Sequence, residues 1–226
     1  MAVAKSVSSR SRSHARGGRP ARGRAGEVDE RILEAAEAAF LERGYEGATI
    51  DEIAQTARAG KPTIYARFPG KDKLFAAVMA RKAARNTAAE SLAPHGRSFQ
   101  AKLVNLGIAL LDRMLADDTI GLVRSAIAEA RRFPGVARTV NHVARQRVSD
   151  NLAGILGEMA RAEGRAGKGA FAADRITDTA QLYLDLMIAG MMLRCLMGDD
   201  AKALRGEVPA HVRRRVNAFL AACEGR

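Results

Sequence analysis

The 226-residue sequence is poor in aromatic residues and in cysteine: it has no tryptophan, three tyrosines, seven phenylalanines and two cysteines. Cys195 and Cys223 lack the short spacing of a metal site and suggest no disulfide framework, so we expect a reducing cytoplasm, no metal and no cofactor. No apolar run reaches about 18 residues, so no membrane span or membrane partner is expected. No apolar stretch follows the N-terminal charges, as a signal peptide would require.

Motifs of catalysis are also missing. The four histidines, His14, His95, His142 and His211, lie far apart in the sequence. No nucleophile elbow, glycine-rich phosphate loop or metal-spaced histidine pair is present. We therefore expect that the protein is not an enzyme.

Positive charge is concentrated at the N-terminus. The chain carries a net charge of +12, and residues 1–26 contain seven basic residues and no acidic one. An all-cationic segment attracts polyanions such as nucleic acid or an anionic membrane surface, although it can also be a solvated tail. Because this segment lacks periodic apolar residues, we predict a disordered basic arm over residues 1–26.

The rest of the sequence predicts an all-α protein. Apolar residues recur at steps of three and four, as in Ile32, Leu33, Ala36 and Phe40, and no strand-like alternation appears. Gly44 is expected to cap the first helix. The expected helices cover residues 28–44, 49–57, 60–68, 71–92, 99–116, 119–132, 136–163, 174–197 and 208–223.

Residues 49–68 form two short helices joined by a tight turn, which is the pattern of a helix-turn-helix. Thr49 followed by Glu52 predicts a capped start for the first of these helices. Ile64 and Phe68 are four residues apart and should face the core. Polar side chains on the other side of the second helix would then be available to phosphates and base edges in the major groove.

Residues 31–78 resemble the DNA-binding domain of the TetR (tetracycline repressor) family of transcriptional regulators. The resemblance is carried by RILEAAEAAFLERGYEGATIDEIA, from Arg31 to Ala54, and by KPTIYARFPGKDKLFAAV, from Lys61 to Val78. It implies that Thr49, Tyr65 and Lys71 contact phosphates. It also implies that Lys61, Pro62, Thr63 and Ala66 lie on or near the groove-facing side, with Arg67 and Lys73 as further candidates.

The turn departs from the family pattern. Where the family usually has Ala-Gly-Val-Ser, this sequence has Ala57-Arg58-Ala59-Gly60. A positive φ at Arg58 would cost roughly 1 kcal/mol because a Cβ is disfavoured there. The alternative is that Gly60 relocates the turn.

The resemblance implies three parts: the arm at 1–26, a helix-turn-helix DNA-binding domain at 27–73, and a helical effector-binding and dimerisation domain at 74–226. Methionines suit irregular apolar cavities, although they are also ordinary core residues. Candidate effector-binding residues are Arg131, His142, Tyr183, Met187 and Met191. Asn141 and Asp185 are further polar candidates.

Two C-terminal helices are candidates for a four-helix dimer interface. One has an apolar stripe at Val208, Val212, Val216, Phe219 and Leu220, and the helix before it mixes large and small residues between Leu182 and Leu193. The alternative is that these faces pack within one subunit.

Together these features predict a cytoplasmic, sequence-specific transcriptional regulator that binds double-stranded DNA and associates with the nucleoid when DNA-bound. We expect a homodimeric repressor that a small-molecule effector releases from a palindromic operator. The alternative from another class is a sequence-nonspecific, nucleoid-type DNA-binding protein.

Overall fold

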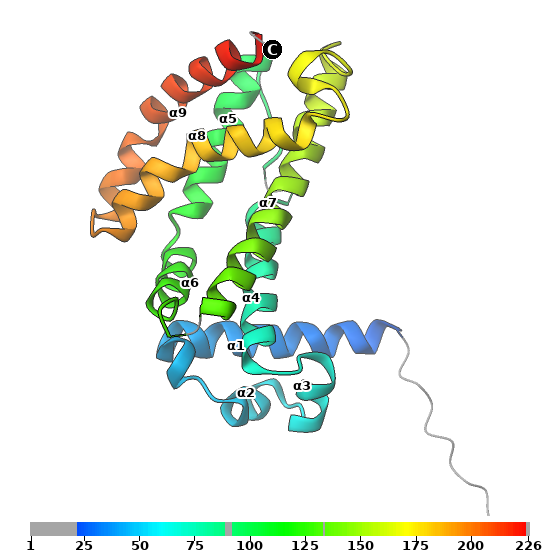
Figure 1. Cartoon of the computed structure of the whole chain (residues 1–226), viewed down its shortest axis with the longest axis vertical. Coiled ribbons are helices and arrows are strands. Elements are labelled where there is room, and N and C mark those ends of the chain that lie inside the picture. The colour runs from blue at the N-terminus through cyan, green and yellow to red at the C-terminus, as the bar shows by residue number, and fades with distance from the viewer. Residues whose placement is uncertain (1–21, 89–91, 133, 225–226) are drawn as a thin grey trace, which may run out of the picture.

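The computed structural model describes residues 22–88, 92–132 and 134–224 (Figure 1). Within these residues the regular structure is helical, as predicted. The elements are α1 (Arg22–Gly47), α2 (Ile50–Ala57), α3 (Lys61–Arg67), α4 (Lys71–Asn86), α5 (Phe99–Met114), α6 (Asp117–Ala128), α7 (Pro134–Ala162), a 3-10 turn η2 (Gly169–Phe171), α8 (Ile176–Leu196) and α9 (Ala201–Glu224).

Helix α1 is longer than predicted at both ends. It begins at Arg22, so residues 22–26 of the predicted disordered arm are helical, whereas residues 1–21 lie outside the described residues. At Gly44 the backbone has φ 70° and ψ 177°, which kinks the chain before a last short helical segment ending at Gly47. Glycine is suited to this positive φ because it has no Cβ. The predicted break at Gly44 is therefore confirmed as a kink.

The N-terminal core lies where α1, α2 and α3 meet the first half of α4. Its centre is an aromatic cluster in which the Phe75 ring is 4.8 Å from the Phe40 ring and 5.1 Å from the Tyr45 ring, measured between centroids. The core extends along α4 to Met79 and includes Leu122 from α6. The predicted boundary after residue 73 therefore falls inside this core.

The second core is formed by α5, α7, α8 and α9, with η2 at one end. Figure 1 shows α1 crossing between α2 and α3 on one side and this larger group of helices on the other. Helix α4 leads from α3 into the larger part, where it packs alongside α7. Among the helices described, none is both long and apolar enough to cross a bilayer.

Two predicted helix ends are corrected. Helix α4 ends at Asn86 rather than near 92. At this end the Thr87 hydroxyl donates a hydrogen bond to Ala83 O at 2.8 Å. Helix α9 begins at Ala201 rather than 208, because the Asp200 carboxylate accepts from Ala203 N at 2.7 Å and caps the helix. Pro209 consequently lies inside α9.

The predicted role of the apolar stripe of α9 as a dimer surface is also corrected. Val208, Val212, Val216 and Phe219 are all at most 1% exposed and pack within one subunit, in the core with α5 and α8. This stripe is therefore not available as a dimer surface. On α8, by contrast, Leu193 is 61% exposed.

Candidate nucleic-acid interface and ligand cavity

Thr49 sets the start of α2. Its backbone is extended, and its hydroxyl accepts a hydrogen bond from Glu52 N at 3.3 Å, as the capping pattern predicted. The Glu52 carboxylate makes an ion pair with Arg43 of α1. Thr49 is exposed, so the N-terminal end of α2 lies at the surface.

The turn between α2 and α3 is made at Arg58. This residue has φ 50° and ψ 45°, the left-handed conformation, whereas Gly60 has φ −68°. Ala59 N donates to Ala54 O at 3.0 Å, a bond typical of a left-handed helix end. Of the two alternatives for the turn, the structure therefore has the strained arginine, at a cost of about 1–2 kcal/mol.

Helix α3 presents one face to solvent and one to the core. Ile64 is fully buried and Phe68 packs partly buried against the same core, as predicted. The residues on the outer face are exposed, with Tyr65 at 49%, and Thr63 is half-buried at its edge. These exposed residues are Lys61, Pro62, Tyr65 and Ala66. Figure 1 shows α2 and α3 together on the opposite side of α1 from the larger group of helices.

Lys61 bridges the two short helices. Its Nζ lies 2.5 Å from Asp51 Oδ1 in the first turn of α2. The hydrogen bond to Asp51 raises the Lys61 pKa above its ordinary value, so this group stays charged. The ion pair also places Lys61 beside the start of α2.

Two other cationic side chains that were predicted to contact DNA bind polar groups of the protein itself. Lys71 Nζ donates to Glu46 O at 3.0 Å and to Ala48 O at 3.1 Å, and it lies 4.8 Å from the centre of the Tyr45 ring. Burial is the main cause of the lowered Lys71 pKa. These contacts hold the segment that leads into Thr49.

Arg67 also has a partner within the domain. Its Nε donates to Asp29 of α1, and the two side chains form an ion pair. This contact ties the end of α3 to the first part of α1.

Helix α6 connects this domain to the rest of the molecule. Tyr45 N donates to Ser125 Oγ at 3.1 Å, and Arg132, just after α6, makes an ion pair with Glu46. Leu122 of α6 is buried in the N-terminal core. A displacement of α6 would therefore directly move the segment before α2.

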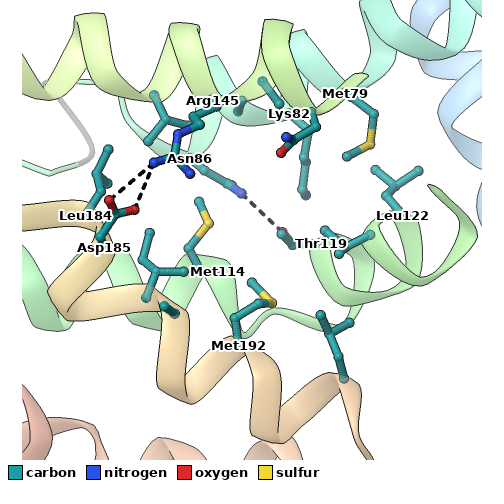
Figure 2. A pocket seen from close by; sticks show the side chains of 18 of the residues that line it. Met79, Lys82, Asn86, Met114, Thr119, Leu122, Arg145, Leu184, Asp185 and Met192 are labelled. Carbon is teal, nitrogen blue, oxygen red and sulfur yellow. Dashed lines mark hydrogen bonds and ion pairs between the residues drawn. The ribbon is translucent and has the colours of Figure 1, made fainter. Parts of the chain in front are cut away.

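A cavity of about 440 Å³ lies among α4, α6, α7 and α8 (Figure 2). Apolar and sulfur-containing side chains form most of its wall, including Met79, Met114 and Met192. Figure 2 shows the ion pair between Arg145 and Asp185 on one side, and Asn86 donating to Thr119 across the cavity. Its size and lining are those of a small-molecule site.

The five residues predicted to bind an effector are placed elsewhere. Tyr183, Met187 and Met191 are at most 2% exposed in the second core, and Tyr183 Oη donates to Leu103 O at 2.6 Å. Arg131 and His142 are exposed. None of the five lines this cavity, whereas the further candidates Asn141 and Asp185 do.

Sequence reasoning missed the contribution of α4 to the cavity. Met79, Lys82 and Asn86 line it from one face of this helix. Their spacing of three and four residues was visible in the sequence. What it could not show is that this face meets α6, α7 and α8.

Comparisons with known proteins agree with this arrangement. Residues 32–78 match the family described as bacterial regulatory proteins, tetR family, and residues 101–224 match the AefR-like transcriptional repressor C-terminal domain. The HTH-type transcriptional repressor AcnR of Corynebacterium efficiens is 28% identical over 176 residues, which cover 77% of this chain and 85% of AcnR.

Two further similarities differ in extent. The HTH-type transcriptional repressor SCO4008 of Streptomyces coelicolor is 52% identical over 52 residues, which span only 23% of this chain and 27% of SCO4008. A TetR-family transcriptional regulator from Mesorhizobium loti has the same fold, with a TM-score of 0.68 and 24% identity over 88% of this chain and 98% of that one.

A short exposed helix behind a tight turn, braced by a third helix, defines a helix-turn-helix DNA-binding regulator of transcription. The matched models identify it more closely: the chain belongs to the TetR family. Regulators of this family bind DNA and effector ligands and function as dimers, and the relatives named above are transcriptional regulators rather than enzymes.

Proposed function

We propose that the protein is a homodimeric repressor that binds an inverted repeat in double-stranded DNA through its two α3 helices. The observation that carries this proposal is the outer face of α3, where Lys61, Pro62, Tyr65 and Ala66 are exposed over the buried anchor Ile64. Repression is supported by AcnR and SCO4008, which are both named as repressors. Such a protein works in the cytoplasm, beside the chromosome.

Individual residues of this surface have distinct roles in the proposal. Tyr65 and Thr49 donate hydroxyl hydrogen bonds to phosphates, while Lys61 and Thr63 reach base edges or phosphates. Pro62 and Ala66 lie against the groove. Lys71 and Arg67 act mainly by holding α2 and α3 in place, since their polar groups already bind Glu46, Ala48 and Asp29.

The dimer is proposed to form through the exposed face of α8. Ala189 and Gly190 are exposed and small, and Leu193 and Met197 are 61% and 80% exposed. Small residues beside large apolar ones allow two helices to approach closely. A second copy would cover this face and set the distance between the two α3 helices.

The cavity is proposed as the effector site. Helix α4 lines it and also carries Leu74 and Phe75 in the N-terminal core, so one rigid element belongs to both sites. An effector that prefers a different position of α4 and α6 would change the spacing of the two α3 helices and release DNA.

Selection from a random pool of double-stranded DNA tests the proposal. We expect enrichment of an inverted repeat whose half-sites lie about 34–36 Å apart, one turn of the duplex. Tyr65→Ala should weaken binding to the selected site about tenfold or more, as expected for a lost phosphate contact. Lys202→Ala, an exposed substitution on α9, is the control and should leave binding unchanged. Uniform affinity for all sequences would instead support the nucleoid-type alternative.

The basic arm is proposed to add affinity with little sequence preference. Residues 1–21 lie outside the described residues, but α1 begins at Arg22, and Asp29 in this part of α1 contacts Arg67 of α3. The first turns of α1 therefore lie near the DNA-binding surface. Deleting residues 1–21 should flatten the dependence of affinity on salt concentration, and an unchanged slope would contradict this role.

A further inference from the structure

Among the residues that the structure describes, three ionisable side chains line the cavity, and two of them neutralise each other. Arg145 Nη2 lies 3.1 Å from Asp185 Oδ1 and 3.2 Å from Asp185 Oδ2. Both side chains are 53% exposed, and both belong to the cavity wall. A ligand in the cavity therefore meets this pair as a whole, with little net charge.

Lys82 is the third ionisable residue, and its situation is different. Its side chain is only 13% exposed, and its carboxylate partners, Asp118 and Glu37, are not part of the cavity wall. Asp118 accepts a hydrogen bond from Nζ, and Glu37 Oε1 lies 3.9 Å away. An ammonium group has three donors, so a further acceptor can be bound from the cavity. Lys82 thus belongs to the cavity wall, whereas its two counter-charges do not.

Apolar side chains share this part of the cavity wall with Lys82. Met79 lies three residues before Lys82 on α4, and Leu122 and Val123 of α6 line the same cavity. Figure 2 shows Met79 and Leu122 on the side opposite the Arg145–Asp185 pair, with Lys82 labelled beside Met79. A partly desolvated cation in apolar surroundings binds an anion more strongly than an exposed one does.

We propose that the cavity takes an amphipathic effector with an apolar body and one anionic group, and that Lys82 is the residue that selects this group. The proposal deepens the proposed function, because it takes this cavity as the effector site.

Lys82 also provides the regulatory coupling. Its ammonium connects Asp118 at the start of α6 with Glu37 of α1, and Glu37 accepts from Arg81 at 2.5 Å. Ser125 of α6 in turn holds Tyr45, before α2. An anion in the cavity competes with Asp118 and Glu37 for Lys82, which loosens α6 from α4 and α1. The binding site and the DNA-binding domain thus share one ion-pair cluster.

The binding test uses two fluorescent probes on the full chain. Anilinonaphthalene sulfonate and phenylnaphthylamine share one ring system, and only the first carries a sulfonate. We expect Lys82→Met to weaken binding of the sulfonate about tenfold, as for a lost charge-assisted hydrogen bond, while binding of the neutral probe is retained. Lys82→Arg should restore the preference for the sulfonate over the neutral probe. The double variant Arg145→Met/Asp185→Leu, which removes the neutral pair as a whole, should have a much smaller effect.

A second variant, expected to tighten sulfonate binding, distinguishes the loss of the Lys82 charge from a folding defect in Lys82→Met. Asp118→Asn removes a competitor for the ammonium and should tighten binding of the sulfonate but not of phenylnaphthylamine. The proposal is overturned if the ratio of the two dissociation constants is the same in Lys82→Met and the wild type, or if the double variant Arg145→Met/Asp185→Leu changes this ratio as much as Lys82→Met does. Failure of the wild type to bind the sulfonate would also overturn it.

Hydrogen exchange tests the coupling. The sulfonate should speed amide exchange in residues 117–128 and 34–41 of the wild type, and phenylnaphthylamine should not. Unchanged exchange in the sulfonate complex would overturn the coupling. Neither experiment uses DNA, so failure to select an inverted repeat would contradict the proposed function while leaving these results intact.

Discussion

The core below α2 and α3 contains a cluster of three packed aromatic rings, whereas the helices α4, α6, α7 and α8 surround a cavity of about 440 Å³ whose mostly apolar wall includes Met79, Met114 and Met192. Phe40, Tyr45 and Phe75 have few rotamers and fix the position of α1 against α4. Methionines around the cavity can adapt to different shapes. The comparison shows a rigid DNA-binding domain joined to a domain whose packing tolerates change.

The largest expected effect tests the rigid side of this comparison. Phe75 is 1% exposed at the centre of the aromatic cluster, so Phe75→Ala leaves a large void. We expect the free energy of unfolding to fall by about 3–5 kcal/mol, measured by urea denaturation followed by circular dichroism. Met192→Ala, in the half-buried cavity wall, is the control and should cost less than about 1 kcal/mol. Equal losses of stability in Phe75→Ala and Met192→Ala would contradict the difference in packing between the two domains.

The second prediction concerns the C-terminal core outside the cavity. Tyr183 is fully buried and donates to Leu103 O at 2.6 Å, which links α8 to α5. Tyr183→Phe should cost about 0.5–1.5 kcal/mol of stability, as for the loss of one buried hydrogen bond. Burial raises the Tyr183 pKa, so the cost should be constant around neutral pH and should shrink as the pH rises past ~10, where the tyrosine of the unfolded chain ionises and the buried one does not.

Tyr65→Phe is the matched control for this tyrosine pair. Tyr65 is 49% exposed, so its hydroxyl should contribute nothing measurable to stability. Tyr65→Phe should instead weaken DNA binding without changing the free energy of unfolding. A loss of stability in Tyr65→Phe as large as that in Tyr183→Phe would contradict the division of roles between the two domains.

A third prediction uses pH at the junction of the two domains. Burial acts to raise the Asp118 pKa, but the hydrogen bond and charge of Lys82 outweigh it, and the pKa is lowered. A carboxyl group with a lowered pKa in the folded state stabilises the protein above its unfolded pKa of about 3.9, and this contribution disappears as the pH falls through the folded pKa.

Asp118→Asn should therefore cost more stability at pH ~7 than at pH ~2, because the ion pair weakens as the Asp118 carboxylate takes up a proton. The effect should stay below about 1 kcal/mol, since the Asp118 side chain is 47% exposed and solvent screens the pair. Urea unfolding at both pH values measures it. A difference between wild type and variant that is independent of pH would rule out the ion pair as its cause.

The DNA-binding domain could be predicted closely from the sequence because its signals are local. The cap at Thr49, the inward-facing Ile64 and the break at Gly44 each depend on a few neighbouring residues. Long cations were harder to place, since the partners of Lys71 and Arg67 lie 23–25 and 38 residues away in the chain. Their roles depended on tertiary contacts.

The cavity could not be predicted for a related reason. A methionine in an apolar helix face can line a cavity or fill a core, and the sequence pattern is the same in both cases. Met187 and Met191 pack in the core, whereas Met192 lines the cavity. Likewise, the stripe on α9 shows that an apolar face is buried, but not whether its partner belongs to the same chain.

The smallest expected effect is a gain in stability at the turn before α3. Arg58 is exposed and holds a left-handed conformation with φ 50°. Arg58→Gly removes the Cβ strain, worth about 1–2 kcal/mol, but gives the unfolded chain more freedom, which offsets about 0.4–1 kcal/mol. We therefore expect a net gain of roughly 0.5–1 kcal/mol, measured by urea denaturation.

Arg58→Ala separates strain from charge in this prediction. It removes the guanidinium but keeps the Cβ, so it should give no comparable gain if the backbone conformation is the cause. An equal gain in both variants would instead assign the cost to the positive charge of Arg58. In that case the rigid domain would carry no backbone strain of consequence at its turn, and α3 would be held by Ile64, the aromatic cluster and the Arg67–Asp29 ion pair.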